Sequence, residues 1–399
     1  MGEYRRIQAD IDLDAIRYNI KTVQALNPAD RKTLLVIKAD AYGHGAVTLA
    51  RELSDLADYF ATATMDEAVE LRRSGVTLPI LILGYTDPSE YKTGIENDIT
   101  LAIYDAERAG VLSDTALQMN KKAKVHIKVD SGMSRIGFQC TEKDVEEAEK
   151  LLGYEGLDVE GIFTHYAKAD YENKSDAMTQ YEKFSWFVKE MEKRGADFKI
   201  RHIDNSAGAM EIHSDGFDMM RLGIVIYGLY PSEEIDKNVV LKPAMTLKAS
   251  VVHVKELEAG RGVGYGWTYV TNKPTKVATV SVGYADGYPR ALSNCGRVLI
   301  HGQYAPIIGR VCMDQIMVDV TDIQSGSNNK ALDDRTEVVC VGDEVVLFGT
   351  QGENHISIEE VAEPANSFNY EMACHISRRV PRIYYKDGQQ VWEVNYLHE

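Results

Sequence analysis

The stretch that sets the pattern of this chain is an apolar run followed by a loop of small residues, Leu34-Leu35-Val36-Ile37-Lys38-Ala39-Asp40-Ala41-Tyr42-Gly43-His44-Gly45. The apolar part predicts a buried strand, and the glycines behind it predict a loop. Lys38 stands where the strand leaves the core. A lysine there can form a Schiff base with a carbonyl compound if nearby groups hold that compound's phosphate, and glycines let backbone approach an anion. The alternative is a surface lysine with a buried stem.

Short apolar runs of this kind recur between residues 33 and 230. The expected strands are 34–37, 59–63, 80–83, 100–103, 124–129, 159–164, 199–203 and 218–221. Amphipathic stretches lie between most of them, such as 46–56, 65–74, 142–152 and 175–194. Eight alternations of strand and helix predict an α/β fold, an N-terminal parallel (β/α)₈ TIM-like barrel.

The rhythm changes after residues 231–234. The apolar runs 249–254, 276–282, 297–300, 316–320 and 345–348 are separated by Gly and Asp, which predicts a C-terminal, mostly antiparallel β domain. The run 7–13 predicts a strand that joins this second domain, so we expect a barrel over 12–240 and a β domain of 1–11 plus 241–399. The polar segment 321–335 predicts a surface loop or insertion, and the tail 385–399 has no clear assignment.

Composition limits the classes of partner. Lys and Arg number 44 against 61 Asp and Glu, which gives a net charge of 44 − 61 = −17. No basic stripe offsets this charge, so neither nucleic acid nor an anionic membrane is an expected partner. The five cysteines form no C-x-x-C pair, which favours reduced thiols in a cytoplasmic protein and no metal site. No apolar stretch approaches the length of a membrane span.

Polar side chains gather where the expected barrel strands end. They are Lys38 after the first strand, Lys128, Asp130 and Arg135 at the fifth, His165 after the sixth, Asn205 and Ser206 after the seventh, and Arg221 at the eighth. Each one alone could be an ordinary strand-end residue. Because active sites of such barrels form at the carboxyl ends of the strands, their shared position predicts a site there.

The ten residues from Val36 to Gly45 resemble the pyridoxal-phosphate lysine signature of alanine racemases, and the resemblance extends over nearly the whole chain. It implies that Lys38 carries pyridoxal 5'-phosphate (PLP) and that Arg221 contacts the ring nitrogen. It implies the further cofactor residues Tyr42, His165, Ser206, Gly223, Ile224 and Tyr370, and the substrate residues Arg135, Met313 and Tyr284. The motif Gly264-Tyr265-Gly266 would carry a second catalytic base, and Cys312-Met313-Asp314-Gln315 would line the site. A head-to-tail homodimer with shared active sites is also implied.

The two implied bases, Lys38 and Tyr265, have a clear chemical logic. Racemisation removes a proton from one face of Cα and returns one to the other face, which two opposed bases do directly. Their ordinary pKa values, about 10, are too high for neutral pH. We expect nearby cations, Arg221 and His165, to lower the pKa of the tyrosine. Without the resemblance, Tyr265 would be interpreted as a turn residue between two glycines.

Arg221 is the most discriminating residue of the set. Many PLP enzymes place a carboxylate at the pyridine nitrogen to keep it protonated and make the ring a strong electron sink. Arginine stays charged and only donates, so it leaves that nitrogen unprotonated. The substrate carbanion is then less delocalised and is returned promptly to Cα, which suits a racemase that must avoid transamination. The alternative is an arginine in an ordinary salt bridge.

Lys128 lies on the polar side of the fifth strand, where a buried unpaired ammonium is costly. In relatives the equivalent lysine is often carbamylated, and the resulting anion would pair with Arg135. Asp130 could pair with either cation instead. We therefore expect carbamylation of Lys128, with Asp130 as the competing explanation.

The expected activity is a PLP-dependent interconversion of L-alanine and D-alanine that supplies D-alanine for peptidoglycan. Three alternatives remain: a racemase of broader specificity that acts on serine, a non-catalytic PLP carrier, and an amino-acid decarboxylase. Carriers on this barrel are single-domain proteins, and decarboxylases of this type favour an acidic partner for the ring nitrogen. The β domain and Arg221 respectively speak against these two.

Overall fold

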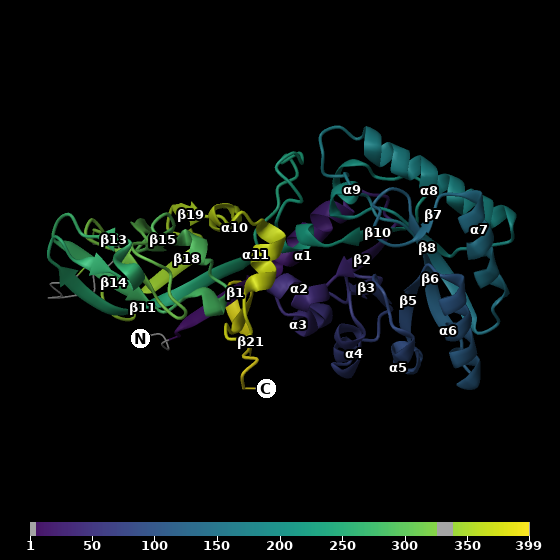
Figure 1. The fold of residues 1–399 in the computed structure, drawn as a ribbon, viewed down its shortest axis with the longest axis horizontal. Helices are drawn as coiled ribbons and strands as arrows, with labels where there is room; N and C mark the ends of the chain where they lie inside the picture. The colour runs from purple at the N-terminus through teal and green to yellow at the C-terminus, as the bar shows by residue number, and fades with distance from the viewer. Residues whose placement is uncertain (1–4, 325–337, 399) are drawn as a thin grey trace. The chain divides into compact units, whose positions relative to one another are not determined.

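The structure, a computed structural model, describes residues 5–324 and 338–398. Its internal contacts divide the chain into two compact units (Figure 1). One unit spans residues 15–242, and the other combines the N-terminal residues up to 14 with residues 243–399. Among the described residues, no helix is long and apolar enough to cross a membrane.

The unit of residues 15–242 is a nearly closed barrel of eight parallel strands. In the order of their pairing they are β10 (Met219–Leu222), β2 (Lys32–Val36), β3 (Tyr59–Thr62), β4 (Ile80–Ile82), β5 (Ile99–Ile103), β6 (Ala123–Asp130), β8 (Leu157–Phe163) and β9 (Ile200–His202). A short strand, β7 (Phe138–Gln139), pairs with β6 at the edge. All eight predicted barrel strands are therefore confirmed.

Hydrogen bonds beside β9 and β10 bring the first and last strands of the sheet together. The N–H of Asp218 donates to the carbonyl of Arg201 at 2.8 Å, and the N–H of Arg221 donates to the carbonyl of Asp204 at 3.0 Å. Strands such as β3 and β5 are buried along their whole length, as expected for parallel strands covered on both faces. The ends of the eight strands consequently form a rim on which functional side chains can meet.

The helices of this unit are α1 (Leu13–Gln24), α2 (Lys38–Gly43), α3 (Ala46–Glu52), α4 (Met65–Arg73), α5 (Tyr91–Glu96), α6 (Ala106–Gln118), α7 (Glu142–Glu149), α8 (Ser175–Lys193) and α9 (Ser206–Glu211). In Figure 1, α3 to α8 lie around the outside of the strands. Their starts follow capping chemistry. Thr64 and Glu67 form a reciprocal capping box at α4, and the Asp105 side chain accepts the N–H of Arg108 at α6, which satisfies N–H groups without a helical partner.

The second unit is built on a mostly antiparallel sheet. Its strands are β1 (Ile7–Asp12), β11 (Met245–Leu257), β12 (Gly262–Val263), β13 (Tyr269–Val270), β14 (Thr275–Val280), β15 (Arg297–Ile300), β16 (Gln303–Pro306), β17 (Ile316–Asp319), β18 (Glu344–Gln351), β19 (Asn354–Ile356), β20 (Arg382–Lys386) and β21 (Gln389–Val394). Its helices are α10 (Ile358–Ala362) and α11 (Asn369–His375). The predicted strand at the N-terminus pairs with β11 and β20, so it does join this unit.

The tail without an assignment forms a hairpin, because β20 pairs with β21 and also runs parallel to β1. Arg382 in β20 is buried and donates to the carbonyls of Ile376, Ser377 and Val380, so its charge does not stop the strand from entering the core. The predicted polar loop 321–335 lies largely outside the described residues.

Candidate active site

The turn that carries Lys38 is wound in the left-handed sense. Strand β2 ends at Val36, one residue earlier than predicted, and Ala39, Asp40, Ala41 and Tyr42 have φ between 51° and 53°. Each such residue costs roughly 1–2 kcal/mol relative to a right-handed turn. The Glu67 carboxylate accepts the N–H of Ala39 at 2.6 Å, and the Asp40 carboxylate accepts that of Ala46 at 2.8 Å. These bonds hold a strained segment in place at the rim, as is typical of functional sites.

Tyr42, Ser206 and Gly223 meet on this rim. The N–H of Gly223 donates to the Ser206 hydroxyl at 2.9 Å. A Cβ atom on Gly223 would lie 3.2 Å from the Tyr42 hydroxyl and 3.7 Å from the Ser206 hydroxyl. Two hydroxyls therefore face a backbone segment that lacks a side chain, and Ile224 follows directly as the first residue of a buried turn. Two hydroxyls beside a glycine, where backbone can approach an anion closely, fit a phosphate group.

Arg221 is buried among acceptors. Its guanidinium lies 3.0 Å from His202 Nδ1 and 3.1 Å from His165 Nδ1, and it donates to the carbonyls of Thr164 at 2.9 Å and Ile203 at 2.7 Å. Burial lowers the pKa of Arg221 to about 10, so it is still a cation at neutral pH. The alternative of an ordinary salt bridge does not describe these contacts, since no carboxylate is among them.

His165 contacts Arg221, but it does not supply the predicted second cation. Burial, followed by the charge of Arg221, holds the pKa of His165 well below its usual range. Because arginine only donates, the contacted Nδ1 is an acceptor and the ring is neutral. His165 therefore adds no positive charge to the barrel rim.

Lys128 is buried close to other cations. Its Nζ donates to the carbonyl of Val129 at 2.5 Å and lies 5.4 Å from the centre of the Phe163 ring, with the Arg221 guanidinium 5.6 Å from the same ring. Burial and then the charge of Arg221 lower the pKa of Lys128 to about 7. A substantial share of this lysine is thus a neutral amine near pH 7, which makes it nucleophilic.

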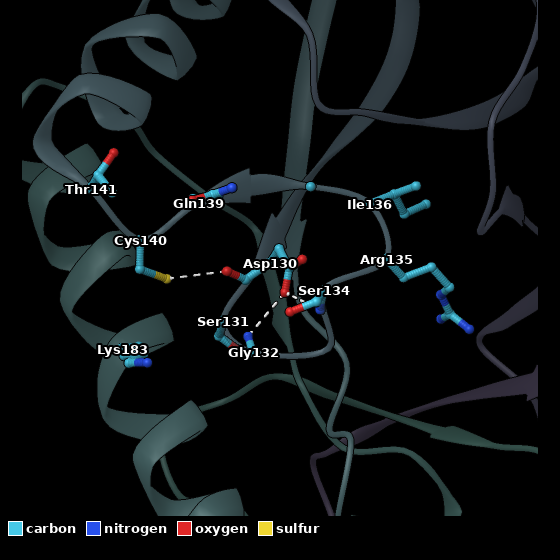
Figure 2. Close-up of a pocket in the computed structure, with 11 residues that line it drawn as sticks. Asp130, Ser131, Gly132, Ser134, Arg135, Ile136, Gln139, Cys140, Thr141 and Lys183 are labelled. Atoms are coloured by element: carbon cyan, nitrogen blue, oxygen red, sulfur yellow. Dashed lines mark hydrogen bonds between the residues drawn. The ribbon is translucent and has the colours of Figure 1, made fainter.

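Asp130 holds the loop that presents Arg135 (Figure 2). Its carboxylate accepts the N–H groups of Gly132 at 3.0 Å and Ser134 at 2.9 Å. In Figure 2 the Arg135 side chain points away from Cys140 and Lys183, on the other side of the loop. The Asp130 carboxylate therefore caps backbone N–H groups and forms no ion pair with Lys128 or Arg135 among the described residues, although its charge raises the pKa of Lys128.

Tyr265 is presented by a tight turn of the β domain. Strands β12 and β13 pair as a short hairpin, and Gly264 and Gly266 on either side of the tyrosine have φ of 66° and 71°, a conformation that favours glycine. The Tyr265 side chain is 70% exposed. It lines a hollow of about 630 Å³ together with the run Cys312 to Gln315 and Met317.

Met313 and Tyr284 lie on two loops that are bonded to each other. The N–H of Tyr284 donates to the carbonyl of Cys312, and that of Ala285 to the carbonyl of Met313, both at 3.1 Å. A Cβ atom on Gly283 would lie only 2.2 Å from the Met313 carbonyl, so the loops touch where only glycine fits. Tyr370, in α11, has its ring 5.5 Å from that of Phe368.

The predicted residues thus fall into two sets. Lys38, Tyr42, Lys128, Arg135, His165, Ser206, Arg221, Gly223 and Ile224 belong to the barrel unit, and Tyr265, Tyr284, Met313 and Tyr370 belong to the β domain. Sequence analysis missed His126, His202 and Glu160, which extend the contacts of Arg221 into the barrel. The sequence signal that could have indicated them was a histidine inside each of two strands that are predicted to be buried. Among the described residues, no group of His, Cys, Asp and Glu is arranged to hold a metal ion.

Two family models match this chain. The alanine racemase N-terminal domain matches residues 11–231, and the alanine racemase C-terminal domain matches residues 244–384. Together the two models cover both compact units.

Curated proteins and solved structures agree with the family models. The chain is 41% identical over 399 residues to alanine racemase 2 of Caldanaerobacter subterraneus, with 99% of each protein covered. It is 44% identical over 395 residues to alanine racemase 1 of Clostridium acetobutylicum, covering 98% of this chain and 99% of that protein. The structure of alanine racemase from Clostridium difficile 630 superposes with a TM-score of 0.91 at 40% identity, covering 99% of this chain and 100% of that one.

Proposed function

We infer that this chain, which belongs to the alanine racemase family, is a racemase that interconverts L-alanine and D-alanine. The observation that carries this inference is Arg221, a buried cation held on neutral acceptors in the same barrel unit as Lys38 and the cradle of Tyr42, Ser206 and Gly223. A donor-only group there disfavours protonation of a cofactor ring nitrogen, which suits racemisation better than transamination or decarboxylation.

The cofactor that we propose is PLP. The cradle of Tyr42, Ser206 and Gly223 fits its phosphate, because a side chain on Gly223 would fill the space that the two hydroxyls face. Ile224 and Tyr370 complete the proposed phosphate contacts, and Lys38 holds the cofactor covalently. When bound, PLP supplies the electron sink that makes the α-hydrogen of an amino acid acidic.

The chain's own groups handle the proton and the substrate carboxylate. Lys38 Nζ and the Tyr265 hydroxyl are the two bases, one for each face of Cα, so one removes a proton while the other delivers one. Arg135 binds the carboxylate with its forked donors, and the Asp130 cap keeps its loop in one conformation. Met313 and Tyr284 limit the space for the substrate side chain, and His165 supports Arg221.

We propose that Lys128 is carbamylated. Its neutral amine attacks carbon dioxide, a C–N bond forms and one proton is released, so that a buried cation becomes an anion. The low pKa of Lys128, caused by burial and the charge of Arg221, supports this reaction because only the neutral amine is nucleophilic. Mass spectrometry of the protein in bicarbonate buffer should find the added mass of one carbon dioxide on this lysine. The Lys128→Met variant should show no such added mass.

We also propose a homodimer with shared sites; the exposure of Tyr265 and Met313, which are 70% and 52% exposed in the single chain, supports this proposal. In this proposal the barrel of one protomer is completed by the β domain of its partner. Co-refolding of inactive Lys38→Ala and Tyr265→Ala chains should then restore roughly a quarter of wild-type activity, since about half of the dimers are hybrids with one intact site of two. Absence of recovery in hybrids confirmed by mass would exclude the shared site.

Substrate breadth is tested by assaying racemisation across single amino acids. We expect alanine to be turned over with the highest kcat/KM and serine more slowly, because Met313 and Tyr284 favour a methyl group. A preference for serine would replace the proposal by the broader-specificity racemase, and PLP binding without turnover would indicate a carrier. We also propose that the enzyme works in the cytoplasm and supplies D-alanine for peptidoglycan. For the domain boundaries we propose a barrel over residues 12–240 and a β domain of residues 1–11 plus 241–399.

A further inference from the structure

A line of four polar side chains runs from the rim of the barrel into its wall. Arg221 Nη1 lies 3.0 Å from His202 Nδ1, and His202 Nε2 lies 2.9 Å from His126 Nδ1. His126 Nε2 in turn lies 3.5 Å from a carboxylate oxygen of Glu160 in β8. Both histidines are fully buried and the Glu160 side chain is 17% exposed. The proposed racemase chemistry uses only the first member of this line.

The contacts of this line have one possible direction. Arginine has donors and no acceptor, so His202 Nδ1 must accept from Arg221. A neutral imidazole has one N–H, so His202 donates through Nε2 to His126 Nδ1. His126 then carries its own hydrogen on Nε2, which faces the carboxylate of Glu160. Every hydrogen in the line therefore points from the guanidinium toward the carboxylate.

Charge and burial agree with this direction. Burial lowers the pKa of His126 and holds that of His202 well below its usual range, so both rings are neutral at neutral pH. The contact with His126 lowers the pKa of Glu160, so this carboxyl is ionised. Tyr59 also hydrogen bonds to the Glu160 carboxyl group, which lowers the pKa of Glu160 further. His126 Nε2 and the facing Glu160 oxygen are buried and have no closer hydrogen-bond partner among the described residues. Each is therefore the available partner of the other, as buried polar atoms require.

We propose that Glu160 and His126 are positioning residues of the racemase that fix the tautomer of His202 and thereby hold Arg221 in place as a donor. The proposal rests on the proposed function, since it concerns the orientation of Arg221 toward a cofactor ring. With the opposite tautomer, the Nδ1–H of His202 would face an N–H of Arg221. Two facing donors repel, and the guanidinium would leave the position set by the carbonyls of Thr164 and Ile203.

The tautomers can be measured without any activity assay. In the full-length dimer labelled with ¹⁵N-histidine, we expect His126 and His202 each to show a protonated Nε2 and an unprotonated Nδ1 at neutral pH. Signals are assigned by loss in His126→Asn and His202→Asn. Glu160→Leu removes the acceptor and should give protonated Nδ1 in His126. Glu160→Gln, which is isosteric, is the second variant for the case that Glu160→Leu does not fold. The control is Glu192→Gln, which alters a carboxylate 3.4 Å from Arg201 elsewhere on the barrel.

Kinetics then separate positioning from a purely structural role. At metal sites, loss of the carboxylate or other partner that orients a histidine typically costs about 10- to 100-fold, and we take the lower end of that range for this metal-free line. We expect kcat to fall about tenfold in Glu160→Leu, with KM within about twofold, more transamination per racemisation, and substantial recovery in Glu160→Asp. Wild-type rings with protonated Nδ1 would overturn the proposal, and so would variants whose kcat and side reaction match those of Glu192→Gln. A wild-type protein without racemase activity would refute the proposed function but would leave the tautomer result standing.

Discussion

The two regions that carry the candidate residues differ most in burial. On the barrel rim Arg221 and Lys128 are each 2% exposed, and their pKa values are lowered by burial and by neighbouring charge. In the β domain Tyr265 is 70% exposed, and Tyr284 and Met313 are 44% and 52% exposed. One region is built around buried charge, and the other presents its side chains on loops and tight turns.

This difference indicates how the two halves of the proposed two-base site are prepared. The barrel half is preorganised in the single chain, because strained backbone and buried hydrogen bonds already fix its groups. The β-domain half fixes its backbone by glycine turns and close loop contacts but leaves its side chains open. We therefore expect substitutions of the buried barrel groups to disturb cofactor binding, stability and chemistry together, and those of the exposed Tyr265, Tyr284 and Met313 to disturb chemistry alone.

The largest effect is expected for Lys38→Ala. Removal of both the covalent link and one base should reduce racemisation by at least about 10³-fold, as loss of a residue central to a covalent mechanism does. Reduction with borohydride and peptide mapping should label Lys38 in the wild type and no other lysine in the variant. Lys92→Ala, at an exposed ion pair with Glu96, is the control. Unchanged labelling in Lys38→Ala would show that another lysine holds the cofactor.

Arg221→Glu should have the next largest effect. A carboxylate at the ring nitrogen would favour its protonation, so racemisation should fall about 10²-fold, the scale of losing one positioned charge. A new long-wavelength absorbance with alanine and more transamination per racemisation should accompany the loss. Arg221→Lys keeps the charge but not the forked donors and should lose activity without that absorbance. Normal racemisation by Arg221→Glu would mean that Arg221 does not touch the ring.

Gly223→Ala tests the cradle directly. The new Cβ would lie 3.2 Å from the Tyr42 hydroxyl, so it should crowd the phosphate and weaken PLP binding about tenfold, the scale of a 1.4 kcal/mol loss. Equilibrium titration of the cofactor-free protein measures the Kd. Gly153→Ala, where a Cβ would meet nothing within 4 Å, should bind PLP as the wild type does. Equal Kd values for the two variants would place the phosphate elsewhere.

The smallest expected effect concerns stability. Burial and the charge of Arg221 lower the pKa of Lys128 from its ordinary value of 10.5 to about 7 in the folded chain. Between these values the unfolded chain binds more protons, so this group makes stability rise with pH in that window, and its full penalty applies below pH 7. In buffer free of carbon dioxide, Lys128→Met should therefore raise Tm at both pH values. The increase at pH 6 should exceed the increase at pH 9 by roughly 2–4 °C. Added bicarbonate should narrow the difference, and a difference that is independent of pH would rule out titration of this lysine.

The sequence predicts the barrel well because most of its strands are short, largely apolar runs set by local composition. The left-handed turn from Ala39 to Tyr42 could not be predicted, since non-glycine residues adopt it only where surrounding contacts compensate its cost. Strand β20 could not be predicted from the sequence for a related reason. Its burial depends on pairing with β1, where Ala9 meets Arg382 across most of the chain, and a buried arginine gives no strand signal on its own.

The candidate site divides in the same way. Strand-end positions predict Lys38, Arg135 and Arg221, because a rim residue follows from the strand that precedes it. The direction of the His126 and His202 contacts depends on atoms from three strands and on the donor-only chemistry of arginine. Such an arrangement is visible only once the strands are placed side by side.

The central claim is that two different bases serve the two faces of Cα, and Tyr265→Phe tests it most directly. The measurement is the rate at which deuterium from solvent enters the α-position of L-alanine and of D-alanine under conditions that isolate proton abstraction. With Lys38 intact and the Tyr265 hydroxyl gone, exchange should fall far more for one enantiomer than for the other. Equal losses for both enantiomers would contradict the two-base account.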